Sequence, residues 1–206
     1  LKIIERGTPL PQNAQLVLIP GSKSTISDLE DFRSQGWDID LQAHVRRGGQ
    51  VLGICGGYQM LGTMIHDPKG IEGPPKSISG LGLLDIETTM SEQKVLQEVT
   101  AITKKDKLMV NGYEIHIGKS VGRDLKNSWL QVNNQDVSAA TKNGQIQGCY
   151  IHGIFSNDEF RASYIKKLGA KFSNVNFEAK IDETLDLLSK HVEKYINLDE
   201  LIKLSK

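Results

Sequence analysis

Cysteine is scarce in this chain: only Cys55 and Cys149 occur among its 206 residues. Two cysteines are too few for a disulfide framework. No group of cysteines and histidines has the spacing of a zinc site, so we expect no metal ion in this domain. The scarcity of cysteine therefore favours a reducing, cytoplasmic compartment over a secreted location.

Net charge is also absent, because 25 basic residues balance 25 acidic ones. This balance gives no electrostatic reason to expect a nucleic acid or a membrane surface as a partner. The apolar runs are far shorter than the roughly 20 residues of a membrane-spanning helix, and no secretory signal pattern opens the chain. Leu1 stands where a methionine would begin a complete protein, so we expect a fragment of a longer chain.

What the sequence does contain is enough apolar residues, 38% of 206, for one sizeable core, and we expect a single domain over 1–206. Its first third alternates strand and helix. The predicted elements are strands at 15–20 and 50–54, and helices at 25–34, at 38–47 with Asp38 as cap, and from 57 to 65. This order predicts an α/β fold, flavodoxin-like, with a mostly parallel central sheet and helices on both faces.

The rest of the chain adds a different pattern. Residues 67–82 hold four glycines and three prolines, which predicts a surface loop. We expect additional antiparallel β elements at 83–89, 94–103, 107–119 and 129–132, a strand at 145–151, and helices at 158–168, 181–195 and from Asn197 onward.

The segment from Gly53 to Gly57 has the form of a nucleophile elbow, with Cys55 in the place of the nucleophile. Such a residue lies on a sharp turn between a strand and a helix, and small neighbours two positions away prevent clashes. The helix N-terminus favours thiolate, and the amide of Gly56 could stabilise an oxyanion. Taken alone, the pattern also fits a buried structural cysteine at a glycine-rich strand end.

A glycine loop follows the first predicted strand, at Pro20 to Thr25. It fails as a Walker A loop, because Ser22 stands where a glycine must precede the lysine. Gly21 and Ser22 could instead supply a second amide to an oxyanion site beside the elbow. The alternative is an ordinary turn between strand and helix.

His152 ends a predicted strand and is followed by glycine, so it could reach a nucleophile at another strand end and serve as its base. His116 is the rival for this role. The remaining histidines, His44, His66 and His191, lie in or at the end of predicted helices and are interpreted as structural or solvated. Cys149 lies in an apolar strand and is interpreted as a core residue.

These segments resemble, in order, the triad-type glutamine amidotransferase domain of the cobyric acid synthase and cobyrinic acid diamide synthase branch. The resemblance covers residues 10 to 170, and PGSKST with GWDID favours cobyric acid synthase. The matching motifs are PGSKST at 20–25, GWDID at 36–40, RRGGQVLGICGGYQMLG at 46–62, GIEG at 70–73, GLGLLDIET at 80–88, GYEIHIG at 112–118 and YIHGIF at 150–155.

The resemblance implies that Cys55 attacks glutamine to form a thioester, with His152 as acid and base. It implies that Gln59 helps to hold glutamine. It also implies an N-terminal synthetase domain in the full chain, which would use ATP and Mg²⁺ to amidate corrin carboxylates with the ammonia. This domain itself then needs no cofactor.

One position departs from the broad family pattern. Many triad-type amidotransferases carry a glutamate two residues after the catalytic histidine, and Ile154 stands there. A histidine base needs a group that fixes its orientation. The candidates are Glu114, a backbone carbonyl or the synthetase domain, and the segment Tyr113, Glu114, His116 could support the site or be purely structural.

The residues are also compatible with three other functions. The elbow would also suit a cysteine peptidase or small-molecule hydrolase. A degenerate site could serve only as an interaction module. Within the same branch, the acceptor could be cobyrinic acid itself or a cell-wall precursor.

Overall fold

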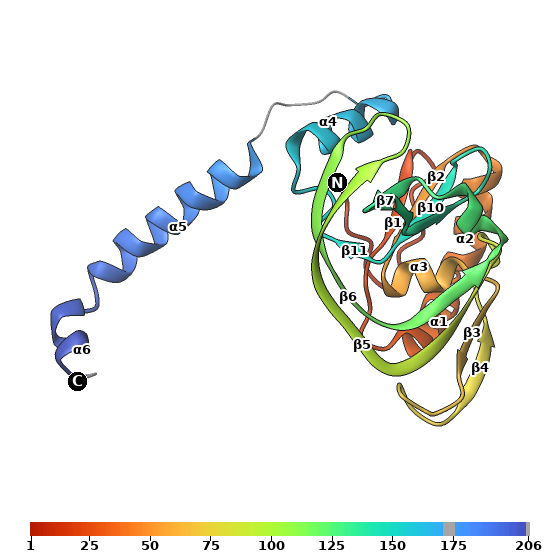
Figure 1. Ribbon diagram of the computed structural model, residues 1–206, viewed down its shortest axis with the longest axis horizontal. Helices are drawn as coiled ribbons and strands as arrows, with labels where there is room; N and C mark the ends of the chain where they lie inside the picture. The colour runs from red at the N-terminus through yellow and green to blue at the C-terminus, as the bar shows by residue number, and fades with distance from the viewer. Residues whose placement is uncertain (171–175, 205–206) are drawn as a thin grey trace. The chain divides into compact units, whose positions relative to one another are not determined.

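The computed structural model describes residues 1–170 and 176–204 (Figure 1). The chain forms two compact units, Leu1–Ile154 and Phe155–Lys206. The first unit contains the predicted catalytic residues. A single domain over 1–206 stays a prediction, since compactness alone does not decide it.

The first unit is built on a four-stranded sheet with strand order β1-β2-β10-β9. β1, β2 and β10 run parallel, and β9 pairs with β10 in the antiparallel direction. The connection from β1 to β2 contains the helices α1 and α2, as the sequence predicts. The strands are β1 (Leu16–Ile19), β2 (Gln50–Ile54), β9 (Ser138–Ala140) and β10 (Ile146–Cys149), and the helices are α1 (Thr25–Ser34) and α2 (Trp37–Arg46).

A second, seven-stranded sheet has the order β11-β6-β5-β3-β4, with β7 paired to β5 and β8 paired to β7. Most of its pairs are antiparallel, so the α/β class, the mostly parallel first sheet and the additional antiparallel strands are all confirmed. Its strands are β3 (Met64–Asp67), β4 (Lys76–Ser79), β5 (Ile86–Thr103), β6 (Met109–Gly122), β7 (Leu130–Val132), β8 (Gln135–Asp136) and β11 (Ile151–His152).

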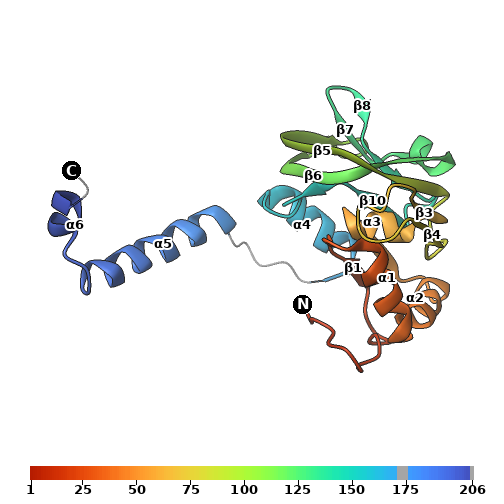
Figure 2. The ribbon, with the colours of Figure 1, turned by 90° about the horizontal axis from the view of Figure 1, so that it is seen from below.

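The long strands β5 and β6 form a curved ribbon (Figure 1). Two separate strands predicted at 83–89 and 94–103 are one strand, β5, whose pairing with β6 shifts register between Thr89 and Lys94. The short 3₁₀ helix at Arg123–Asn127 follows β6. In Figure 2 the helix α3 (Gly56–Leu61) lies between this ribbon and the helices α1 and α2.

The predicted helix from 57 to 65 is too long, because α3 ends at Leu61 and β3 begins at Met64. Gly62 lies so close to β5 that a Cβ there would be 2.6 Å from the carbonyl oxygen of Ile86. The amide of Thr63 donates to the same oxygen at 2.7 Å. The amide of Thr63 therefore bonds to β5 and is not available for the hydrogen bond that would extend α3.

Two other boundary predictions are wrong. Asp38 does not cap α2: the helix begins at Trp37, after Gly36 with φ +72°, and Asp38 lies in its first turn. The predicted loop at 67–82 contains β4, which pairs with β3.

One hydrophobic core joins the first sheet to its helices and to the second sheet. Its members are buried side chains from α1, α2, β2, α3 and β5, among others Leu29, Leu41, Val51, Leu61 and Ile86. This packing fixes the ends of β1 and β2 relative to α3, and those ends carry the predicted catalytic loops.

The second unit contains α4 (Asp158–Lys167), α5 (Phe177–Glu193) and α6 (Leu198–Leu204). The predicted cap at Asn197 is present, since its Oδ1 accepts the amide of Glu200 at 3.3 Å. Among the residues that the structure describes, no helix has both the length and the apolarity needed to span a bilayer.

Candidate active site

Cys55 lies on the turn between β2 and α3, with φ +53° and ψ −112°. A side chain larger than glycine adopts positive φ only where the surrounding structure enforces it, and such strain gathers at functional sites. Here the enforcement comes from both sides, because β2 is paired on both edges and α3 is fully buried. The turn has the geometry that the elbow motif predicts.

The glycines around Cys55 are required by close backbone approach. A Cβ at Gly53 would lie 2.7 Å from the Cα of Tyr58, and one at Gly57 would lie 2.1 Å from the carbonyl oxygen of Ile19. Atoms this close must move. The spacing of glycine two residues before and after Cys55 therefore reflects the packing of α3 against β1 and β2.

Cys55 is 7% exposed, and its Sγ donates to the carbonyl oxygen of Ile115 at 3.3 Å. Burial raises the pKa of Cys55, and the negative charge of Glu72 raises it further, whereas the backbone amide of Gly56 lowers it. Burial outweighs the amide. The expectation of a thiolate favoured by the helix end is therefore wrong for the free site, where the thiol form dominates.

Gly21 lies between Cys55 and His152. A Cβ added at Gly21 would be 2.9 Å from the Cε1 of His152 and 3.5 Å from the Cβ of Cys55. The strand ends of β1, β2 and β11 thus bring together the three residues that the sequence analysis selected. A glycine is needed here because the imidazole occupies the space of a side chain.

The loop at Gly21 and Ser22 also meets the start of α3. A Cβ at Gly56 would lie 2.8 Å from both the amide nitrogen and the Cβ of Ser22. Ser22 is therefore packed against Gly56, the residue that follows Cys55. Ser22 is fixed there by its hydroxyl, which donates to Asp28 at 2.5 Å and accepts the amide of Ser24 at 2.9 Å.

Replacing Gly21 by alanine is expected to lower kcat by about 100-fold, because the new methyl group displaces the imidazole by a few tenths of an ångström or more. The unfolding transition should shift little, since Gly21 is exposed. Ser24→Ala is the matched control in the same loop, because its side chain makes no capping hydrogen bond. Equal rates for the two variants would contradict the placement of His152.

The imidazole of His152 stacks on the ring of Tyr113, with ring centroids 5.2 Å apart and planes 3° apart. Its Nε2 is buried and makes no hydrogen bond to any residue that the structure describes. Ile154 is 1% exposed and belongs to the interior, so no acid occupies the usual position. Stacking on Tyr113 is thus the contact seen here that orients the ring.

Glu114 is not brought to His152. In the pairing of β6 with β11, Tyr113 lies opposite His152 and Glu114 lies opposite Ile151. Because successive side chains of a strand point to opposite faces, Glu114 leaves the sheet on the other face from His152. Its Oε2 accepts from the Nε2 of Gln97 at 2.8 Å.

His116 stacks on Tyr150, with centroids 3.7 Å apart, and burial lowers its pKa. Its Nδ1 makes no hydrogen bond within residues 1–170 and 176–204. His44 and His66 are held by structural contacts: His44 Nε2 lies 2.9 Å from the carbonyl oxygen of Gln50, and His66 Nδ1 lies 2.9 Å from the hydroxyl of Ser77. The predicted helix end at His66 is wrong, because His66 belongs to β3.

Gln59 is 2% exposed and both ends of its amide are engaged. Its Oε1 accepts from the hydroxyl of Thr25 at 3.3 Å, and its Nε2 donates to the carbonyl oxygen of Ile117 at 2.9 Å and to the hydroxyl of Tyr150 at 3.3 Å. In this arrangement Gln59 ties α1, α3 and β6 together behind Cys55.

A polar chain extends from Gln59 into the second sheet, and the sequence analysis missed it. The Tyr150 hydroxyl lies 2.6 Å from the hydroxyl of Ser120, which lies 2.7 Å from that of Thr88. Buried polar groups that satisfy one another in this way fix a unique arrangement. No sequence signal marks it, because its residues come from four distant segments.

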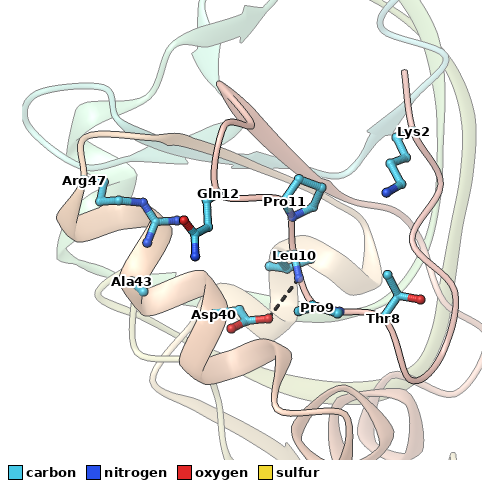
Figure 3. A pocket seen from close by; sticks show the side chains of 9 residues that line it. All are labelled: Lys2, Thr8, Pro9, Leu10, Pro11, Gln12, Asp40, Ala43 and Arg47. Atoms are coloured by element: carbon cyan, nitrogen blue, oxygen red, sulfur yellow. Dashed lines mark hydrogen bonds between the residues drawn. The ribbon is translucent and has the colours of Figure 1, made fainter.

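A separate cavity of about 460 Å³ lies between the N-terminal segment and α2. Figure 3 shows its lining, including Lys2, Asp40 and Arg47, with the amide of Leu10 donating to Asp40 at 2.9 Å. None of the predicted site residues lines this cavity. The cavity is therefore separate from the predicted site at Cys55.

Comparisons with known proteins identify the family of the chain. Residues 1–160 match the family model of the CobB/CobQ-like glutamine amidotransferase domain. Cobyric acid synthase of Bradyrhizobium sp. strain BTAi1 is 48% identical over 207 residues, which cover 100% of this chain and 42% of that protein. Cobyric acid synthase of Ruegeria sp. strain TM1040 is 46% identical over 205 residues, which cover 100% of this chain and 42% of that protein.

Solved structures share the fold. A glutamine amidotransferase matches with a TM-score of 0.53 and 18% identity over 76% of this chain and 80% of its own. PurLQS from Thermotoga maritima matches with a TM-score of 0.50 and 16% identity, and the match covers 75% of this chain and 76% of that chain. The chain spans less than half the length of its curated relatives. With the family model matched over most of its length, the chain belongs to the CobB/CobQ-like glutamine amidotransferase domain family.

Proposed function

We propose that this chain hydrolyses glutamine and supplies the ammonia for amidation of corrin carboxylates, as the amidotransferase part of a cobyric acid synthase. The observation that supports the proposal is the close approach of Gly21 to both His152 and Cys55, the base and the nucleophile of the proposed reaction. Two relatives with the name cobyric acid synthase match the whole chain and support the acceptor.

The proposed reaction begins when Sγ of Cys55 attacks the side-chain carbonyl carbon of glutamine while His152 takes the thiol proton. The oxygen that becomes negative would accept hydrogen bonds from the amides of Gly56 and Ser22, since Ser22 is packed against Gly56, directly after Cys55. The C–N bond then breaks. His152 returns the proton to the departing ammonia, and a thioester remains.

Water completes the cycle. His152 removes a proton from it, the hydroxide attacks the thioester, and glutamate leaves as the thiol of Cys55 regains its proton. The thiol form of the free site suits this scheme, because the proton that leaves Sγ is the one that ammonia needs. Gln59 acts as a positioning residue in the proposal, since its amide is already bound by Thr25, Ile117 and Tyr150.

The proposal includes an N-terminal synthetase domain in the same full-length chain as the partner that consumes the ammonia. ATP and Mg²⁺ belong to that domain. In the proposal the glycine loop of this chain serves the oxyanion site, since Gly21 and Ser22 are packed against His152 and Gly56. Both cysteines are free thiols, which fits a reaction in the cytoplasm.

The test uses the full-length gene product with ATP, Mg²⁺ and glutamine labelled with ¹⁵N in its side-chain amide. We expect ¹⁵N in the corrin product when cobyrinic acid a,c-diamide is the acceptor, measured by mass spectrometry. Transfer to cobyrinic acid alone would identify the diamide synthase instead. Cleavage of peptides or esters with glutamine ignored would contradict the amidotransferase assignment.

A further inference from the structure

The contact between Tyr113 and His152 is built by the two strands that carry them. The residues pair across β6 and β11, and their rings lie parallel, with centroids 5.2 Å apart and planes 3° apart. A Cβ at Gly112 would lie 2.1 Å from the carbonyl oxygen of His152, so glycine is needed for this close approach of the strands. With φ +73° at Gly153, β11 ends directly after His152. The backbone therefore holds the imidazole against one aromatic ring.

His152 becomes positively charged in each half of the proposed reaction, because it takes a proton first from Cys55 and then from water. Burial raises the pKa of Cys55, so the thiol of the free site is protonated and the charge on His152 arises only during the reaction. In a complete triad a carboxylate stabilises the imidazolium. Here Ile154 fills the usual position of that acid, and Glu114 leaves the sheet on the other face. Another group is needed for this role.

The face of an aromatic ring attracts a cation that lies within about 6 Å of its centroid. The imidazole of His152 meets this condition at Tyr113. We propose that the ring face of Tyr113 replaces the triad acid, because it both orients the imidazole and stabilises the imidazolium. Tyr113 is thus a positioning residue that acts through His152. This inference rests on the proposed function and names the third member of its site.

The aromatic ring of Tyr113, and not its hydroxyl, makes the contact with His152. In the described part of the chain the hydroxyl makes no hydrogen bond. The side chain is 44% exposed, so its replacement leaves no cavity in the core. The inference therefore predicts that phenylalanine can replace Tyr113 and that an aliphatic side chain cannot.

The test measures glutamine hydrolysis by the full-length gene product and its Tyr113 variants. Tyr113→Phe should keep kcat within about twofold of the wild type, because it retains the ring face. Tyr113→Leu should lower kcat by about 10- to 100-fold, since the imidazole loses both its orientation and the stabilisation of its charge. KM should change little, because Tyr113 acts on His152 and not on glutamine. Activity of Tyr113→Leu equal to that of Tyr113→Phe would overturn the inference.

A fluorinated ring separates the electrostatic role from simple packing. With 3,4,5-trifluorophenylalanine at position 113 the shape of the ring is nearly kept, but fluorine withdraws the negative charge from its face. We expect kcat to fall about 2- to 30-fold below that of Tyr113→Phe, the range of a cation–π contact. Equal kcat for the two rings would show that Tyr113 only packs against His152, and would overturn its role in place of the acid.

Tyr195→Leu is the matched control, because it removes the same side chain from another contact between tyrosine and histidine. Tyr195 lies against His191, with ring centroids 4.9 Å apart, and neither residue belongs to the proposed site. Its kcat should equal that of the wild type. A loss as large as that of Tyr113→Leu would count against a specific role of Tyr113. A wild type that does not hydrolyse glutamine would instead overturn the proposed function itself.

Discussion

Replacing Cys55 by serine is expected to reduce glutamine hydrolysis by at least about 1,000-fold, because a hydroxyl cannot form the thioester under the same base. The substitution is nearly isosteric. It keeps the positive φ of +53° and the packing of α3, so the thermal unfolding transition should stay close to that of the wild type. Steady-state release of glutamate measures the loss, and circular dichroism measures the fold.

Cys149→Ala is the control for the Cys55 variant. Cys149 is the other thiol of the chain, fully buried in β10, and burial raises its pKa to about 12. Truncating it removes a small apolar group from the core, so we expect some loss of stability but near-normal kcat. If Cys149→Ala and not Cys55→Ser abolished hydrolysis, the site would be misassigned.

The second large effect is expected at His152, where His152→Asn should lower kcat by about 100- to 10,000-fold. The amide of asparagine can fill part of the space beside Gly21 but cannot take a proton from Cys55. The measurement is kcat for glutamine over a range of pH. Loss of activity should not be recovered at high pH, where the thiol ionises without a base, because the departing ammonia still lacks its acid.

His116→Asn separates the two histidines that the sequence analysis proposed. His116 stacks on Tyr150 and supports the polar chain at Gln59, so its loss should lower kcat by less than about tenfold and mainly reduce stability. A larger fall in kcat for His116→Asn than for His152→Asn would make His116 the base.

The sequence was sufficient for the local parts of the site. Each of these parts is encoded by a few consecutive residues, because tight turns restrict the residue type at fixed positions. They are the elbow at Cys55, the loop at Gly21 and the strand end at His152. The parallel order of β1 and β2 then requires their carboxyl ends to meet at one edge. Local pattern and topology together predicted Gly21 and the two residues that lie next to it, Cys55 and His152.

The remaining parts depend on contacts between distant segments. The polar chain from Gln59 through Tyr150 to Ser120 joins three distant segments, and the charge of Glu72 affects Cys55 from the region that composition predicts to be a surface loop. The sequence also predicted that the N-terminus of the helix favours the thiolate of Cys55. In the structure, burial raises the pKa of Cys55 and so favours the thiol. Desolvation depends on how completely the core closes over the thiol, which no local pattern encodes.

Helix and strand boundaries failed where tertiary hydrogen bonds compete with local preference. The predicted helix through 65 is cut short because β5 takes the amide of Thr63, so His66 lies in a strand. The structure likewise resolves the question of Glu114, since the register with β11 places it opposite Ile151. Register is a property of the paired strands and is not visible in either strand alone.

The central claim is that Cys55 attacks the side chain of glutamine. The most direct measurement is peptide mass spectrometry of the full-length gene product after reaction with diazo-oxonorleucine, a glutamine analogue that alkylates the attacking thiol and loses nitrogen gas. We expect one adduct, on Cys55, which excess glutamine prevents and which Cys55→Ser lacks. An adduct on Cys149, or glutamine hydrolysis that continues with Cys55 unmodified, would contradict it.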